Sequence, residues 1–105
     1  MEDELFEKFW ELFNPDPEFN NRRAATHLQW HKCSDEKKAA IIKALTEGKQ
    51  RSSSNPYFYV QDFRFRTQQV MSFNEYYQRF GTTKPRDGWQ QANPTGNKVI
   101  YIKTN

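Results

Sequence analysis

The 105-residue sequence has one cysteine, four glycines and no long apolar run. A single cysteine, Cys33, can form neither an intrachain disulfide nor a cysteine-based zinc cage, and this favours a reducing compartment. The glycines are scattered, so the common glycine-rich phosphate-binding motifs are absent from the sequence. No stretch approaches the roughly 18 apolar residues of a membrane span, and residues 2–4 are acidic where a secretory signal would be basic. These absences predict a cytoplasmic protein with no membrane association.

Aromatic residues are abundant in a chain that is otherwise poor in apolar residues. They make up 16% of the sequence, whereas all hydrophobic residues together make up 35%. So many rings argue against a disordered chain, which would lack core-forming residues. The length suits one hydrophobic core. We therefore expect a single domain, residues 1–105, with a helical core in residues 1–66 and an extension in residues 67–105.

Three helices are expected in the first half of the chain. Apolar residues recur at three- and four-residue spacing over residues 4–13, and the two prolines that follow end this helix. Residues 20–33 predict a second helix, with Asn20 or Asn21 as its N-cap. Ser34, which precedes two acidic residues, predicts the N-cap of a third helix that closes at a glycine.

A fourth helix is predicted after a polar, serine-rich connection. Asn55 offers an N-cap and Pro56 a proline at the first helical position, where its missing N–H costs nothing. The alternation of Phe63 and Phe65 also permits a strand.

The C-terminal part changes character. Residues 73–80 predict a fifth helix, whereas residues 89–92 and 99–103 flank a turn that contains proline and glycine and predict a β-hairpin. The predicted fold class is mainly α: a small helical bundle of three to five helices with a C-terminal β-hairpin.

Charge is divided unevenly along the chain. Residues 1–18 contain seven acidic residues and one lysine, whereas the remainder contains fifteen basic and six acidic residues. The overall charge of +3 therefore combines an acidic first helix with a basic body. A basic face that binds a polyanion would have to come from the body.

The sequence offers little that points to catalysis. His27 and His31 lie four residues apart, a spacing that puts both rings on one face of a helix and is the best metal-binding candidate. No glutamate of the metalloprotease motif lies between them, and Cys33 is on another side of the same helix. Ordinary surface histidines and a buried thiol are the favoured interpretation, so we predict neither an enzyme nor a bound metal or cofactor.

Basic residues interleaved with aromatic residues are the remaining functional signal. Lysine and arginine can contact phosphates and tyrosine can stack on bases, so this mixture is typical of nucleic-acid binding. The alternative is that the rings of residues 57–65 belong to the core, because a chain short of aliphatic residues must use rings inside. The predicted nucleic-acid-binding residues are Arg22, Arg23, Lys37, Lys38, Tyr57, Tyr59, Arg64 and Arg66.

A family resemblance covers residues 6–66. It is carried by Phe6-x-x-Phe9-Trp10-x-x-Phe13, Arg22-Arg23-Ala24-Ala25, Trp30, Lys32-Cys33-Ser34-Asp35-Glu36-Lys37 and Asn55-Pro56-Tyr57-Phe58-Tyr59-Val60. With these residues the chain resembles a helicase-loader or replication-organiser-like module of phage and mobile-element replication proteins. The chain departs from that pattern at residues 14–18, where the family usually has lysines and glycine.

These observations predict a non-enzymatic nucleic-acid-binding or replication-associated adaptor. The resemblance implies a phage or mobile-element origin. The implied partner is nucleic acid, with DNA favoured over RNA, or a replication protein. The alternative is a protein–protein interaction module that uses the acidic amphipathic first helix. A metal- or thiol-dependent enzyme using His27, His31 and Cys33 is the least favoured class, and the sequence leaves the oligomeric state open.

Overall fold

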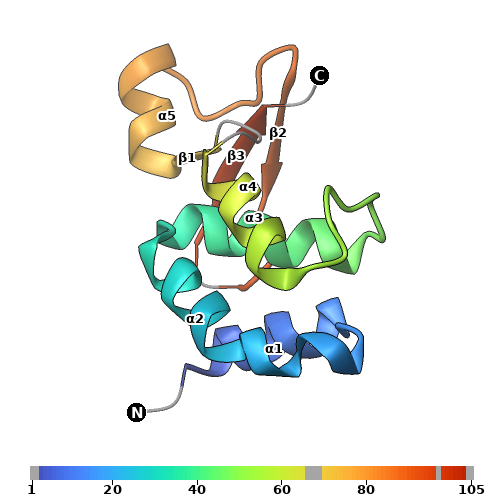
Figure 1. The fold of residues 1–105 in the computed structure, drawn as a ribbon. Helices are drawn as coiled ribbons and strands as arrows, with labels where there is room; N and C mark the ends of the chain where they lie inside the picture. Colours follow the sequence, from blue (N-terminus) through green and yellow to red (C-terminus); the bar gives the residue numbers. More distant parts are fainter. Residues whose placement is uncertain (1–2, 66–69, 97, 104–105) are drawn as a thin grey trace.

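The fold is mainly helical, with a small antiparallel sheet near the C-terminus, in a computed structural model that describes residues 3–65, 70–96 and 98–103 (Figure 1). This confirms the predicted fold class. In chain order the elements are α1 (Glu4–Phe13), the 3₁₀ helix η1 (Pro17–Arg22), α2 (Arg23–Lys32), α3 (Asp35–Thr46), α4 (Pro56–Phe65), β1 (Val70–Ser72), α5 (Phe73–Phe80), β2 (Trp89–Ala92) and β3 (Ile100–Lys103).

Helix α1 forms as its apolar spacing predicts. Asp3 caps its N-terminus by accepting a hydrogen bond from the backbone N–H of Phe6, at 3.0 Å. Phe6, Phe9 and Phe13 are buried on one face. The last turn has no basic residue of its own, but Arg51 donates to the backbone carbonyl of Phe13 at 2.6 Å. The connection between α3 and α4 is thereby fastened to the C-terminal end of α1, where a cation is favourable.

Helix α2 begins later than the sequence predicts, and the expected asparagine N-cap was wrong. Asn20 and Asn21 lie inside η1, and the residue before α2 is Arg22, which makes no capping side-chain hydrogen bond. The physical reason is that Pro17 already starts helical backbone in η1, and the chain then runs directly into α2.

Helix α3 is the central element of the helical part. Ser34 caps it as predicted, because its hydroxyl accepts a hydrogen bond from the backbone N–H of Lys37 at 3.1 Å. The helix contacts α1, α4, β1 and β3, which explains why five of its side chains are buried. In Figure 1 it lies between the α1–α2 end of the molecule and the sheet. Gly48 follows it with a positive φ of 70°, a conformation that glycine adopts at little cost.

Residues 56–65 form a helix, so the strand alternative was wrong. The Asn55 side chain accepts a hydrogen bond from the backbone N–H of Tyr57 at 3.0 Å, and Pro56 occupies the first helical position, as predicted. The helical period places Phe63 in the core and turns Phe65 towards solvent.

The C-terminal part contains one strand more than predicted. Strands β2 and β3 pair antiparallel as the expected hairpin, and β1 pairs with the other edge of β3, which gives the order β1-β3-β2. Helix α5 follows β1 directly through a capping box between Ser72 and Glu75. Ile100, Tyr101 and Ile102 of the central strand are all buried.

One hydrophobic cluster joins the two parts of the chain. Ile100 and Ile102 of β3 belong to the same buried cluster as the rings of α1 and α4 and the aliphatic side chains of α3. Trp30, fully buried, stacks on Phe9 at 5.0 Å between ring centroids, whereas Trp10 is only partly buried beside them. Within the described ranges, the structure has no helix that is long and apolar enough to span a membrane.

Candidate nucleic-acid interface

A polar network joins α2, α3 and α4 around the nearly buried side chain of Gln29, which is 8% exposed. Its amide nitrogen donates to the Tyr57 hydroxyl at 3.2 Å, and its amide oxygen accepts from the Arg64 guanidinium at 3.2 Å. The Lys37 ammonium donates to the backbone carbonyl of Arg64. Gln29, which the sequence did not single out, thus joins two of the predicted nucleic-acid-binding residues, and Lys37 is joined to them through the Arg64 backbone.

Positive charge gathers at the turn between α2 and α3. Burial raises the pKa of the Cys33 thiol, and the charges of Lys37, Arg64 and Lys38 act in the opposite direction. The Lys37 ammonium bonds to the Arg64 backbone carbonyl, and the Lys38 ammonium lies 6.0 Å from the ring centroid of Trp30, so cations from two helices lie near the end of α2. The thiol itself is buried and donates to the Gln29 backbone carbonyl at 3.6 Å, so it is a core group.

Exposed rings lie next to these cations on α4. The guanidinium of Arg64 lies 4.4 Å from the ring centroid of Phe65, a side chain that is 64% exposed. Phe58, seven residues earlier on the same helix face, is 50% exposed. The sequence missed Phe58 and Phe65 as surface groups, although once the helix is known the seven-residue spacing identifies them.

Tyr59 lies in the core, not on this surface. Its side chain is buried and contacts the rings of Phe9, Phe13 and Phe63. Burial raises the pKa of its hydroxyl to about 12. For Tyr59 the alternative prediction, that the rings of residues 57–65 belong to the core, is therefore correct. Its ring is not available for stacking on a base.

The remaining predicted residues are not part of the network. Arg23 forms an ion pair with Glu7 and lies over the rings of Phe6 and Trp10, so it fastens α2 to α1. Arg22 is exposed at the opposite end of α2 from the cluster. Arg66 lies outside the described residues.

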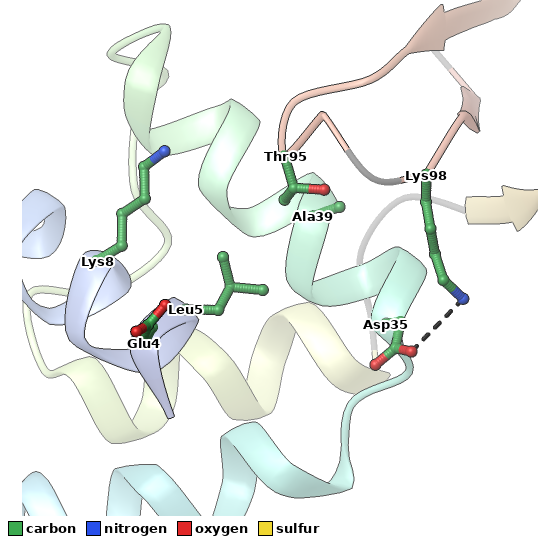
Figure 2. A pocket seen from close by; sticks show the side chains of 7 residues that line it. All are labelled: Glu4, Leu5, Lys8, Asp35, Ala39, Thr95 and Lys98. Atoms are coloured by element: carbon green, nitrogen blue, oxygen red, sulfur yellow. Dashed lines mark ion pairs between the residues drawn. The ribbon is translucent and has the colours of Figure 1, made fainter. Parts of the chain in front are cut away.

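A separate pocket of about 560 Å³ lies between α1, α3 and the connection from β2 to β3 (Figure 2). Leu5 points into it from α1, and at its rim Lys98 reaches Asp35 at 3.5 Å. The side chains that line the pocket carry charges of both signs, and an ion pair joins two of them. This arrangement fastens the hairpin to α3 and offers no surface of one charge to a polyanion.

Comparison of the chain with protein-family models, with curated proteins and with solved structures found no match.

Proposed function

We propose that this chain is a non-enzymatic nucleic-acid-binding domain, a replication-associated adaptor of a phage or mobile element, which acts in the cytoplasm and prefers DNA. The observation that carries the proposal is that Gln29 holds Tyr57 and Arg64 together, with Lys37 bonded to the Arg64 backbone carbonyl, beside the exposed ring of Phe65. The resemblance of residues 6–66 to replication modules supports the same class of function.

The network would hold its groups ready for a phosphate backbone. Arg64 has five N–H donors and directs one to Gln29, and the Lys37 ammonium has three and directs one to a carbonyl. These hydrogen bonds orient the two side chains before a ligand arrives, so little side-chain entropy remains to be lost on binding. Phosphate contacts give affinity that depends on salt but not on sequence.

Single-stranded nucleic acid suits this face better than a duplex groove. Helices α2 and α3 are joined by a tight turn, but α3 is the central core helix, so it is not available to enter a major groove as a recognition helix would. Exposed rings beside cations provide stacking platforms for unpaired bases. Phe65, with Arg64 over its ring, is the expected platform.

Fluorescence anisotropy of labelled single- and double-stranded oligonucleotides at several salt concentrations tests the proposal. Log affinity should fall linearly with log salt, with a slope of about 0.7 per phosphate neutralised on a single strand. Arg64→Ala should lower that slope by about one phosphate equivalent, and Phe65→Ala should weaken single-strand binding by about 1–3 kcal/mol with little change in slope.

The matched control is Arg79→Ala, which removes an exposed arginine from α5, outside the Gln29 network. It should leave the slope nearly unchanged. A thermal melt of each variant separates lost binding from lost folding, because Arg64 also supports Gln29. If the wild-type chain retains no DNA or RNA at low salt, or if Arg79→Ala and Arg64→Ala act alike, the proposed face is wrong.

A protein-interaction module is the second candidate, and one observation favours it. Leu28, Phe58 and Phe65 are exposed on α2 and α4, and apolar side chains at a surface are a common feature of protein interfaces. The apolar stripe of α1 is buried in the core. The face of α1 that a partner could contact is therefore the acidic outer face. Association that persists at high salt would favour this candidate over nucleic-acid binding.

A further inference from the structure

Three potential metal ligands meet where the start of α1 approaches α2. Asp3 precedes α1, and His27 and His31 lie one turn apart on α2. The Nε2 atom of His27 is 3.5 Å from Oδ2 of Asp3, and the two imidazole rings are 4.3 Å apart between centroids. One donor atom from each of the three residues lies within 4.8 Å of the other two.

Two of the three ligands are already oriented by other contacts. One oxygen of Asp3 accepts the capping hydrogen bond from Phe6, which leaves the second oxygen facing His27. The His27 ring stacks on the Phe6 ring at 4.3 Å with an interplanar angle of 24°. Supporting contacts of this kind hold metal ligands in position before the ion binds.

The nitrogen of His27 that faces Asp3 is shielded from solvent. Within the described residues, this Nε2 atom makes no hydrogen bond of good geometry, and the Asp3 carboxylate oxygen beside it lies 3.5 Å away. A buried polar atom that has only a long contact is costly. An ion bound between the two residues would give both of these atoms a bond.

We propose that Asp3, His27 and His31 bind a divalent transition-metal ion of the zinc class, with water completing its coordination. Two imidazoles and one carboxylate suit zinc, cobalt or nickel, whereas magnesium and calcium take mainly oxygen ligands. Tetrahedral bonds of about 2.0–2.2 Å separate the ligand atoms by roughly 3.3–3.6 Å. The Asp3 and His27 atoms already have this spacing, at 3.5 Å. His31 is exposed and can turn inward to complete the site.

The ion would join the start of α1 to α2, on a side of α2 that does not include the Gln29 network. The inference is therefore independent of the proposed function, and either can fail alone. Because the chain has two histidines and one cysteine, few other ligand sets compete for the ion.

The test uses the full 105-residue chain, freed of metal with a chelator and titrated with Zn²⁺ or Co²⁺. We expect one ion per chain, visible absorption from bound Co²⁺, a rise in melting temperature, and displacement of both imidazole NMR signals. Mg²⁺ should have none of these effects. Binding to the folded state alone raises stability by the linkage relation, so the melt reports affinity as well.

Two variants remove ligands without removing the fold. Asp3→Asn keeps a good N-cap for α1 while it deletes the carboxylate, and His31→Gln changes an exposed side chain. Each should weaken Zn²⁺ binding by more than about tenfold. The matched controls are Glu11→Gln, which removes the same charge elsewhere on α1, and Cys33→Ala, which removes the thiol. Both should bind as the wild type does.

Three outcomes would overturn the proposal: no saturable Zn²⁺ binding, equal binding by Asp3→Asn or His31→Gln and the wild type, or loss of binding in Cys33→Ala. If the imidazole NMR signals do not respond to Zn²⁺ or Co²⁺, the His27–Asp3 contact is an ion pair and no metal site. Melts in the presence of chelator show whether each variant is folded.

Discussion

Tyr59 serves the fold as an apolar residue, although its hydroxyl can ionise. Its ring lies among the phenylalanines of α1 and α4, and its pKa is raised to about 12 from the ordinary value of 10.0, chiefly by burial. The folded chain therefore keeps the proton at a pH where the unfolded chain loses it. This difference makes unfolding easier in alkali.

The stability of the wild type should fall as the pH rises from about 10 to about 12. Below pH 10 the hydroxyl is protonated in both states and this contribution is intact, whereas two pKa units correspond to about 2–3 kcal/mol lost at the upper limit. The Tyr59→Phe variant has no hydroxyl to ionise, so its stability should not show the part of the decrease that comes from Tyr59. Denaturant titrations of both proteins at pH 8 and pH 11 measure it. A stability difference that does not change with pH would show that Tyr59 ionises normally.

At the scale of single residues, chemistry was predictable from the sequence but burial was not. The cationic character of Lys37 and Arg64 follows from residue type, whereas the contacts of Arg64 with Gln29 and with Lys37 depend on how α2 and α3 pack against α4. Phe9 and Trp10 are neighbouring aromatic residues in the sequence, but the helical period places Phe9 at the centre of the apolar stripe and Trp10 at its edge.

Capping residues define the helices at the scale of elements. Ser34 lies in the two-residue turn between α2 and α3, and its hydroxyl accepts a hydrogen bond from the Lys37 N–H at the start of the central helix. A defect there affects the helix on which α1, α4 and the sheet all pack.

Ser34→Ala should lower the free energy of unfolding by about 1 kcal/mol, because an N–H at the helix start loses its acceptor. The control is Ser52→Ala, which changes an exposed serine in the connection before α4. Its effect should be within about 0.5 kcal/mol of zero. Urea denaturation measures both. Coincident midpoints for Ser34→Ala and the wild type would mean that another group caps α3.

Elements with a long periodic pattern or a capping signal were predicted, and those without were missed. Helices α1, α3, α4 and α5 and the β2–β3 hairpin carry such signals. Strand β1 has three residues, too few for a period, and it forms through pairing with a distant segment, as in Val70 opposite Ile102. The 3₁₀ helix was missed because the asparagines within it were interpreted as caps.

The whole molecule depends on β3, which is both the central strand and a contributor to the helical core. Ile100 and Ile102 lie in the cluster with α1, α3 and α4, although the sequence assigned them to an extension. The 1–66 and 67–105 parts therefore share buried surface. We expect them to unfold together.

Ile100→Ala should destabilise the chain by about 2–5 kcal/mol, because it leaves a cavity in a fully buried site. In a Trp89→Phe background, where only Trp10 and Trp30 of the helical part fluoresce, the loss should appear equally in tryptophan fluorescence and in the far-ultraviolet circular dichroism of the whole chain. Lys103→Ala, at the exposed end of the same strand, is the control and should change little. Two separate transitions would show that the two parts fold independently.

The late position of β3 in the sequence has a consequence for synthesis on the ribosome. Residues are made in order, and domains generally fold once their complete segment has emerged. The apolar face of α3 that meets β3 remains uncovered until residues 100–102 leave the exit tunnel. Translation that stops before these residues would release a product with exposed core surface and an unpaired β1, a suitable substrate for chaperones and proteases.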